Sequence, residues 1–184
     1  MSIATSLGSD NIIRMSVLQG EAKASSDPKV EFGTVLGSCV ATCLYDPVAR
    51  IGGMNHFLLA EPPESLSRSA FDGSYGLFLM EKLINEMLKL GAVKHRLKGR
   101  LYGGSNINRD LGEIGTRNAA FAREFLRGEG IEKAFEDLEG EHARRIHFRP
   151  ASGLVKCRSV ADISAPKDKP LVRPKSALGT VELF

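Results

Sequence analysis

Apolar residues change their spacing along this chain, and each change marks a new structural element. Over residues 74–90 they recur every three or four positions, which places them on one face of a helix. These positions are Leu77, Met80, Leu83, Ile84, Met87 and Leu88. A second helical pattern runs from about residue 113 or 116 to about residue 127, where glycines follow it. The pattern therefore predicts two main helices.

The other apolar stretches are short and rich in β-branched and aromatic residues, which is typical of strands. The strand candidates cover residues 15–23, 29–36, 40–45, 51–59, 97–102, 131–138, 144–148 and 154–160. Strands and helices in this proportion predict an α/β fold, a layered α/β sandwich with a mainly antiparallel sheet.

The 184 residues are 42% hydrophobic and 26% charged, a composition typical of one globular domain. Residues 1–14 are polar and aperiodic, and we expect a flexible N-terminus there. Residues 161–184 are rich in proline and lysine without an apolar period, which predicts a disordered basic tail. The folded domain is therefore expected to span residues 15–160.

A predicted hairpin brings the most reactive pair of side chains together. Asp46 and Pro47 indicate a turn between two apolar strands, residues 40–45 and 51–59. If the turn is centred between Pro47 and Val48, Cys39 lies directly across from His56, with Cβ atoms about 5 Å apart. A register slip of one residue would put the two side chains on opposite faces.

A second interpretation of this stretch makes Gly37 and Ser38 the start of a helix, with Cys39 in its first turn. The helix dipole would then lower the pKa of the thiol. The hairpin is the favoured interpretation, and the helix stays open as the alternative.

The pair suggests nucleophilic catalysis. A cysteine needs a neighbouring base, and His56 can take its proton and return it to a leaving group. Ser38 and its neighbours offer backbone N–H groups for an oxyanion, and Thr34 can orient the imidazole through its other nitrogen. A buried thiol beside an unrelated histidine remains the simpler alternative.

Two other motifs could form a site: a set of zinc-ligand residues and a glycine-rich segment. Cys39, Cys43 and His56 share a hairpin face, but the two sulfurs would lie about 13 Å apart along a strand, too far for one zinc ion. No metal site is therefore expected, and Cys43 and Cys157 are interpreted as core residues. The glycine-rich segment before Ser105 and Asn106 matches no phosphate-binding motif. It predicts either a turn that needs positive φ or a site wall formed by Ser105 and Asn106.

Charge, cysteine content and hydropathy indicate which partners and which cellular location to expect. The net charge is +3 with scattered basic residues, so we expect no nucleic acid partner. Three cysteines without a secretory pattern indicate a reducing compartment, and the cytoplasm is the expected location. No stretch approaches the roughly 20 apolar residues that a bilayer span needs, so no membrane insertion is expected.

Four stretches together resemble the CheD family of chemoreceptor glutamine deamidases, over about residues 30–160. They are LGSCVATCLYDPVARIGGMNHFLL, YGGSNI, GTRNAAFAREFLRGEGI and EDLEGEHARRIHFRPASGLV. The resemblance implies an α/β sandwich similar to the catalytic domain of cytotoxic necrotising factor toxins. It implies hydrolysis of glutamine to glutamate on methyl-accepting chemotaxis receptors, with no cofactor.

The resemblance also assigns residues. The family's nucleophile falls on Cys39 and its histidine on His56. The family uses a threonine shortly before the cysteine; Gly33 aligns with it, and Thr34 lies one place later. A CheC-type phosphatase is a further implied partner. Two other functions stay open: methylesterase action at the same receptor positions, and a non-catalytic adaptor that docks on receptors or on the phosphatase.

Overall fold

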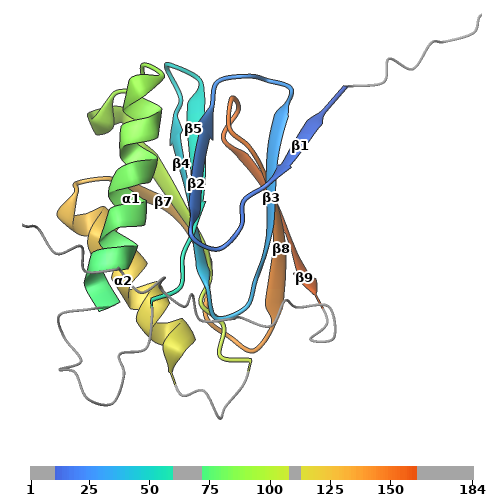
Figure 1. Cartoon of the computed structure of the whole chain (residues 1–184), viewed down its shortest axis with the longest axis vertical. Helices are drawn as coiled ribbons and strands as arrows, with labels where there is room; N and C mark the ends of the chain where they lie inside the picture. Colours follow the sequence, from blue (N-terminus) through green and yellow to red (C-terminus); the bar gives the residue numbers. More distant parts are fainter. Residues whose placement is uncertain (1–10, 60–71, 108–112, 161–184) are drawn as a thin grey trace, which may run out of the picture.

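Two β-sheets pack face to face, and two helices cover the outer face of one of them (Figure 1). The structure is a computed structural model that describes residues 11–59, 72–107 and 113–160. The predicted tail and most of the predicted N-terminal segment lie outside these residues. Residues 13 and 14, which we expected in that flexible segment, belong to the first strand.

Within the described residues the first sheet has four strands in the order β1-β3-β8-β9 and the second has five in the order β2-β5-β4-β6-β7. Neighbouring strands are antiparallel except for the parallel pairs β1–β3 and β6–β7. The strands are β1 (Ile13–Ser16), β2 (Glu21–Ser25), β3 (Val30–Leu36), β4 (Val40–Asp46), β5 (Ile51–His56), β6 (Lys98–Gly103), β7 (Glu132–Leu138), β8 (Ala143–Arg149) and β9 (Leu154–Val160).

The two predicted helices are present as α1 (Asp72–Lys89) and α2 (Ile114–Gly128), and a short 3₁₀ turn covers Lys94–Arg96. Both helices pack on the five-stranded sheet. The predicted α/β sandwich with mainly antiparallel pairing is confirmed. Neither described helix has the length and apolarity that a membrane span requires.

The predicted strand over residues 15–23 is wrong, because the chain changes sheets within it. β1 pairs with β3 in one sheet and β2 pairs with β5 in the other. Val17 is fully buried at the crossing, and Gly20 adopts a φ of 89°. Glycine reaches this left-handed conformation without a steric penalty. The segment therefore forms two short strands, and Gly20 lies in the turn between them.

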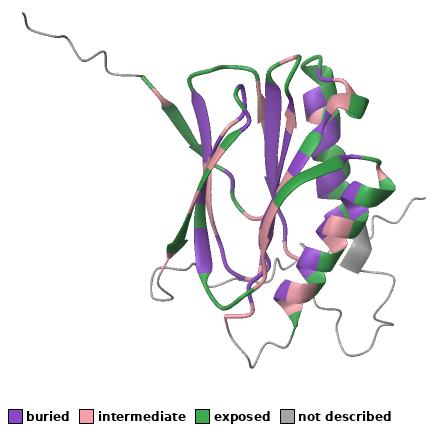
Figure 2. Ribbon diagram, turned by 180° about the vertical axis from the view of Figure 1, so that it is seen from behind, coloured by how far each residue is buried: buried purple, intermediate pink, exposed green. Residues whose placement is uncertain are grey.

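The core has two layers, one between the sheets and one between the helices and the five-stranded sheet. Strand β4 lies between both layers, so almost all of its residues are buried (Figure 2). A strand covered on both faces reads as a continuous apolar run rather than an alternating one. Ala41 and Cys43 of β4, like Cys39 just before the strand, face the other sheet, and Val40 and Leu44 face the helices.

The β4–β5 hairpin forms as predicted, but its register differs by two residues. Asp46 pairs with Ile51, so the turn holds four residues instead of two. Pro47 does not suit the primed turns of two-residue hairpins. Instead the Asp46 carboxylate accepts hydrogen bonds from the backbone N–H groups of Val48 and Ala49, both at 3.0 Å, and Arg50 closes the turn at a φ of 56°.

A shift of two residues preserves the face of every side chain, because side chains alternate with a period of two. Val40 pairs with Phe57, so Cys39 and His56 are diagonal neighbours on the same face rather than directly opposite. The alternative with a helix starting at Gly37 is wrong, since residues 37 and 38 form a bend and β4 starts at Val40.

Candidate active site

The turn that carries Cys39 is fixed from one side by three hydrogen bonds. The backbone N–H of Ser105 donates to the Gly37 carbonyl at 2.9 Å, and that of Gly104 donates to the Cys39 carbonyl at 2.7 Å. The side-chain amide of Asn118 donates to the Ser38 carbonyl at 2.8 Å. Three successive carbonyls therefore point toward β6 and α2, and the peptide planes around Cys39 are fixed.

The glycine-rich segment makes this close approach possible. Gly103 has a φ of 105°, and a Cβ atom there would lie 2.2 Å from the Cys39 carbonyl oxygen. Any larger residue would push β6 away from the Cys39 turn. The prediction of a turn with positive φ is confirmed.

Ser105 and Asn106 do not line the pocket described below. The Ser105 hydroxyl is 2.7 Å from the His142 carbonyl oxygen and accepts a hydrogen bond from Arg144 at 2.6 Å. The Asn106 side chain bonds to the Thr116 hydroxyl at 2.8 Å. These contacts hold the loop after β6 in place behind the Cys39 turn. The structure thus places both residues in the support of the Cys39 turn.

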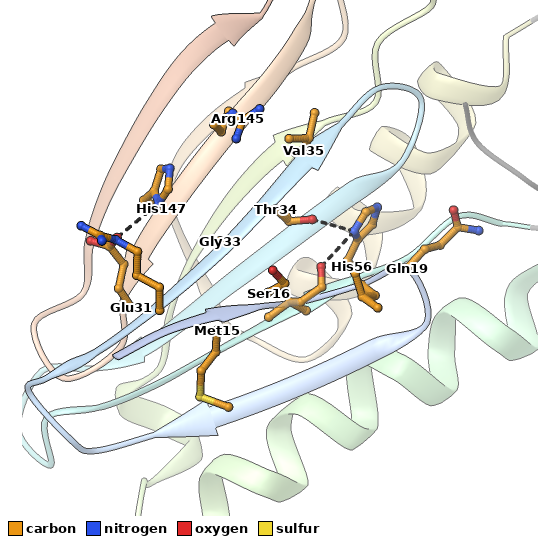
Figure 3. A pocket seen from close by; sticks show the side chains of 13 residues that line it. Met15, Ser16, Gln19, Glu31, Gly33, Thr34, Val35, His56, Arg145 and His147 are labelled. Carbon is orange, nitrogen blue, oxygen red and sulfur yellow. Dashed lines mark hydrogen bonds and ion pairs between the residues drawn. The ribbon is translucent and has the colours of Figure 1, made fainter. Parts of the chain in front are cut away.

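His56 is buried at the end of β5 and reaches the other sheet. Its Nδ1 atom lies 2.9 Å from the Thr34 hydroxyl on β3 and 3.3 Å from the Val17 carbonyl oxygen (Figure 3). A carbonyl can only accept, so the Val17 contact favours the tautomer with the proton on Nδ1. In that tautomer the lone pair of the ring is on Nε2. The geometry expected between Thr34 and His56 is present.

The sulfur of Cys39 is buried in the layer between the sheets, with no exposed surface on the residue. Its Sγ atom contacts the Oε1 atom of Gln19 at 3.6 Å. A substrate therefore reaches this sulfur only after a covering side chain moves.

The other two thiols differ from Cys39 in their surroundings. Cys43 is a core residue, as predicted, and burial raises its thiol pKa far above the ordinary value. Cys157 is only partly buried and packs against the core between the sheets, at its margin. Burial and the neighbouring Asp137 carboxylate raise the Cys157 pKa to about 11. Both groups are protonated and unreactive at neutral pH.

A pocket of about 430 Å³ extends from His56 along β1 and β3. Thr34, His56 and Gln19 lie at one end, and Glu31 and His147 lie at the other (Figure 3). The rim near Glu31 is basic, because Arg14 and Arg145 also line the pocket.

Glu31 is the acidic centre of that distal end. Its carboxylate lies 3.2 Å from His147, 3.4 Å from Arg14 and 3.4 Å from Arg149. Burial alone would raise the pKa of Glu31, but the hydrogen bonds from Arg149 and Arg14 and the neighbouring His147 outweigh it and lower the pKa. His147, for which the sequence suggested no partner, is thus paired.

The sequence analysis did not predict three residues that contribute to the site. Val17 contributes only a carbonyl oxygen, Gln19 comes from a turn between sheets, and Asn118 reaches the Cys39 turn from α2. Only Asn118 could have been found from the sequence, because it is a polar residue on the apolar, core-facing side of the second helix. Among the described residues, no group of three or more His, Cys, Asp or Glu side chains is arranged to hold a metal ion.

Comparison with known proteins adds the following. The family described as CheD chemotactic sensory transduction matches residues 58–159. The protein named "Probable chemoreceptor glutamine deamidase CheD" of Zymomonas mobilis is 50% identical over 95% of this chain and 94% of its own length. The protein of the same name in Caulobacter sp. strain K31 is 47% identical over 94% of this chain and 93% of its own length.

Among solved structures, the Neisseria meningitidis protein NMB0706 matches with a TM-score of 0.47 and 11% identity, over 71% of this chain and 65% of that one. The family match begins at Leu58, after Thr34, Cys39 and His56 in the sequence.

Proposed function

This chain belongs to the CheD family, and on that premise we propose that it hydrolyses specific glutamine side chains of chemoreceptors to glutamate through Cys39 and His56. The names of the relatives in Zymomonas mobilis and Caulobacter support the substrate. One observation carries the catalytic assignment: His56 is oriented by Thr34 and Val17 on the same sheet face as Cys39. We assign the activity to the domain of residues 15–160.

The first step is proton transfer. His56 Nε2 takes the proton of the Cys39 thiol, and Thr34 and Val17 hold the ring through Nδ1. The imidazolium that forms is stabilised by two oxygen atoms near Nδ1. The thiolate attacks the amide carbon of the substrate glutamine, and a carbon–sulfur bond forms while the carbonyl oxygen becomes an oxyanion.

The Cys39 turn supplies donors for that oxyanion. In a trans peptide the C=O and N–H groups point in opposite directions. Since the carbonyls of Gly37 and Ser38 are held toward Ser105 and Asn118, the N–H groups of Ser38 and Cys39 point the other way. Fixed backbone donors of this kind stabilise the charge without reorganising during the reaction.

Protonated His56 then donates its proton to the departing nitrogen, and ammonia leaves. A water molecule, activated by the neutral His56, hydrolyses the thioester and restores the thiol. The product is a glutamate side chain. The chemistry needs no cofactor.

The surroundings of the site fit an acidic receptor surface in the cytoplasm. Arg14 and Arg145 line the pocket and can pair with carboxylates beside the target glutamine. All three cysteines are free thiols, which agrees with a reducing compartment. A CheC-type phosphatase is a further proposed partner, supported by the family relationship.

The test is to incubate the purified protein with a receptor cytoplasmic fragment and to measure ammonia release and fragment mass. Deamidation adds about one mass unit per site, and methylesterase action removes a methylene from a methylated fragment. Cys39→Ala should fold, keep receptor binding and release no ammonia. Deamidation at the wild-type rate by Cys39→Ala would refute the assignment, and binding without any chemistry in the wild type would indicate an adaptor.

A further inference from the structure

Gln19 is the only glutamine in the sequence, and its carboxamide lies against the proposed nucleophile of a glutamine deamidase. The Oε1 atom is 3.6 Å from Cys39 Sγ. The side chain is partly buried, lines the pocket and reaches past His56 (Figure 3). It therefore occupies the space between the pocket and the buried sulfur.

The turn that carries Gln19 is fixed to the catalytic strands on both sides. The backbone N–H of Val17 donates to the Gly33 carbonyl on β3 at 3.0 Å, and that of Gly20 donates to the His56 carbonyl on β5 at 2.8 Å. Glu21 closes the turn by accepting a hydrogen bond from the Leu18 N–H at 2.9 Å. The backbone of this turn is thus held, so a displacement of Gln19 involves its side chain rather than the turn.

The atoms in contact indicate a resting arrangement rather than a reacting one. An amide oxygen only accepts hydrogen bonds, so this contact suits a thiol that donates to Gln19 and does not suit a thiolate. In a reacting complex the thiolate would face the amide carbon and backbone N–H groups would hold the oxygen.

We propose that Gln19 occupies the subsite for the substrate carboxamide, so that a receptor glutamine must displace the enzyme's own glutamine to reach Cys39. The proposal rests on the proposed function. It assigns the space around Gln19 Oε1 as the place where the substrate side chain enters. The resident side chain carries the same functional group on the same number of carbons, so the subsite fits both.

The experiment is iodoacetamide labelling of the whole protein, with Cys39, Cys43 and Cys157 resolved by peptide mass spectrometry. Gln19→Ala should label at Cys39 about fivefold faster than the wild type, the factor for one net hydrogen bond of ~1 kcal/mol. Millimolar propionamide, a free carboxamide, should slow labelling in Gln19→Ala and leave the wild type unchanged. Val48→Ala, at an exposed turn position remote from the pocket, is the control and should label as the wild type does.

Unchanged Cys39 labelling in a Gln19→Ala protein with wild-type circular dichroism would overturn the proposal, and so would insensitivity of that variant to propionamide. A gain of about one mass unit on the wild-type peptide with Gln19 would also overturn it, because the residue would then be a substrate. Labelling needs no receptor. If Cys39→Ala still deamidated receptors, the proposed function would fail while the labelling result would still decide the role of Gln19.

Discussion

Asn118 links the two halves of the proposed catalytic pair, and its removal offers a sharp test of the site. The residue is fully buried on α2. Its amide nitrogen donates to the Ser38 carbonyl at 2.8 Å, and its oxygen accepts from the Leu59 N–H at 2.8 Å. One side chain thus holds the turn before Cys39 and the segment after His56 at a fixed separation.

The substitution Asn118→Ala leaves the buried Leu59 N–H and the partly buried Ser38 carbonyl without their partner. Each such group costs ~1–3 kcal/mol, so the free energy of unfolding should fall by about 4 kcal/mol. The higher helix propensity of alanine offsets roughly 0.5 kcal/mol of this loss in unfolding free energy. For a chain of this size the net loss lowers the melting temperature by roughly 7–14 °C.

The loss of activity in Asn118→Ala should exceed the loss that unfolding alone would cause. The Ser38 carbonyl also fixes the direction of the Cys39 N–H, so its release moves a proposed oxyanion donor. Displacements near 1 Å in a catalytic array cost about 10²-fold in rate. We therefore expect kcat on a receptor fragment to drop by roughly that factor at a temperature where the variant is fully folded.

The assays are thermal unfolding by circular dichroism and ammonia release from the receptor fragment. Asn85→Ala is the matched control, because Asn85 is an exposed position on α1 and undergoes the same chemical change. It should be as stable and active as the wild type. If Asn118→Ala behaved like Asn85→Ala in both assays, the bridging role of Asn118 would be refuted.

Two further predictions concern the imidazole and the hairpin turn. Thr34→Val keeps the side-chain shape but removes the hydroxyl 2.9 Å from His56 Nδ1; kcat should fall about tenfold with KM unchanged, and Thr34→Ser should restore most of it. Equal kcat in all three proteins would exclude an orienting role. Asp46 is buried, and although burial raises its pKa, hydrogen bonds from Arg96 and three backbone N–H groups hold the pKa far below the ordinary value. A lowered pKa contributes stability that is present above the unfolded-state pKa of ~3.9 and is lost as pH falls below it. Urea titrations from pH 6 to pH 2 should therefore show a steeper loss of unfolding free energy in the wild type than in Asp46→Asn; parallel curves would contradict this.

Much of the fold can be predicted from local pattern. The period of apolar residues identified both helices, and the β4–β5 hairpin followed from Asp46, Pro47 and the apolar strands around them. Cys39 and His56 lie on the same face, as predicted, although the predicted register was wrong by two residues. Side-chain direction depends only on whether the shift is odd or even.

Other features depend on packing between segments far apart in the sequence. No local pattern indicates that residues 15–23 split between two sheets, since each half satisfies its backbone hydrogen bonds only with a distant strand. The same holds for Ser105 and Asn106. Their residue types suit a site wall, but the loop after β6 turns them toward α2 and β8.

The sequence by itself determined most of the elements and the shared face of the thiol and the imidazole, because these depend on periodicity and on local turn chemistry. The family followed from the resemblance of its motifs to known sequences. Tertiary structure alone decided what surrounds that pair. The surrounding residues come from three separate segments: Thr34 from β3, Val17 and Gln19 from the turn between β1 and β2, and Asn118 from α2. Their meeting depends on how two sheets and a helix pack together, and residue spacing along the chain does not specify that geometry.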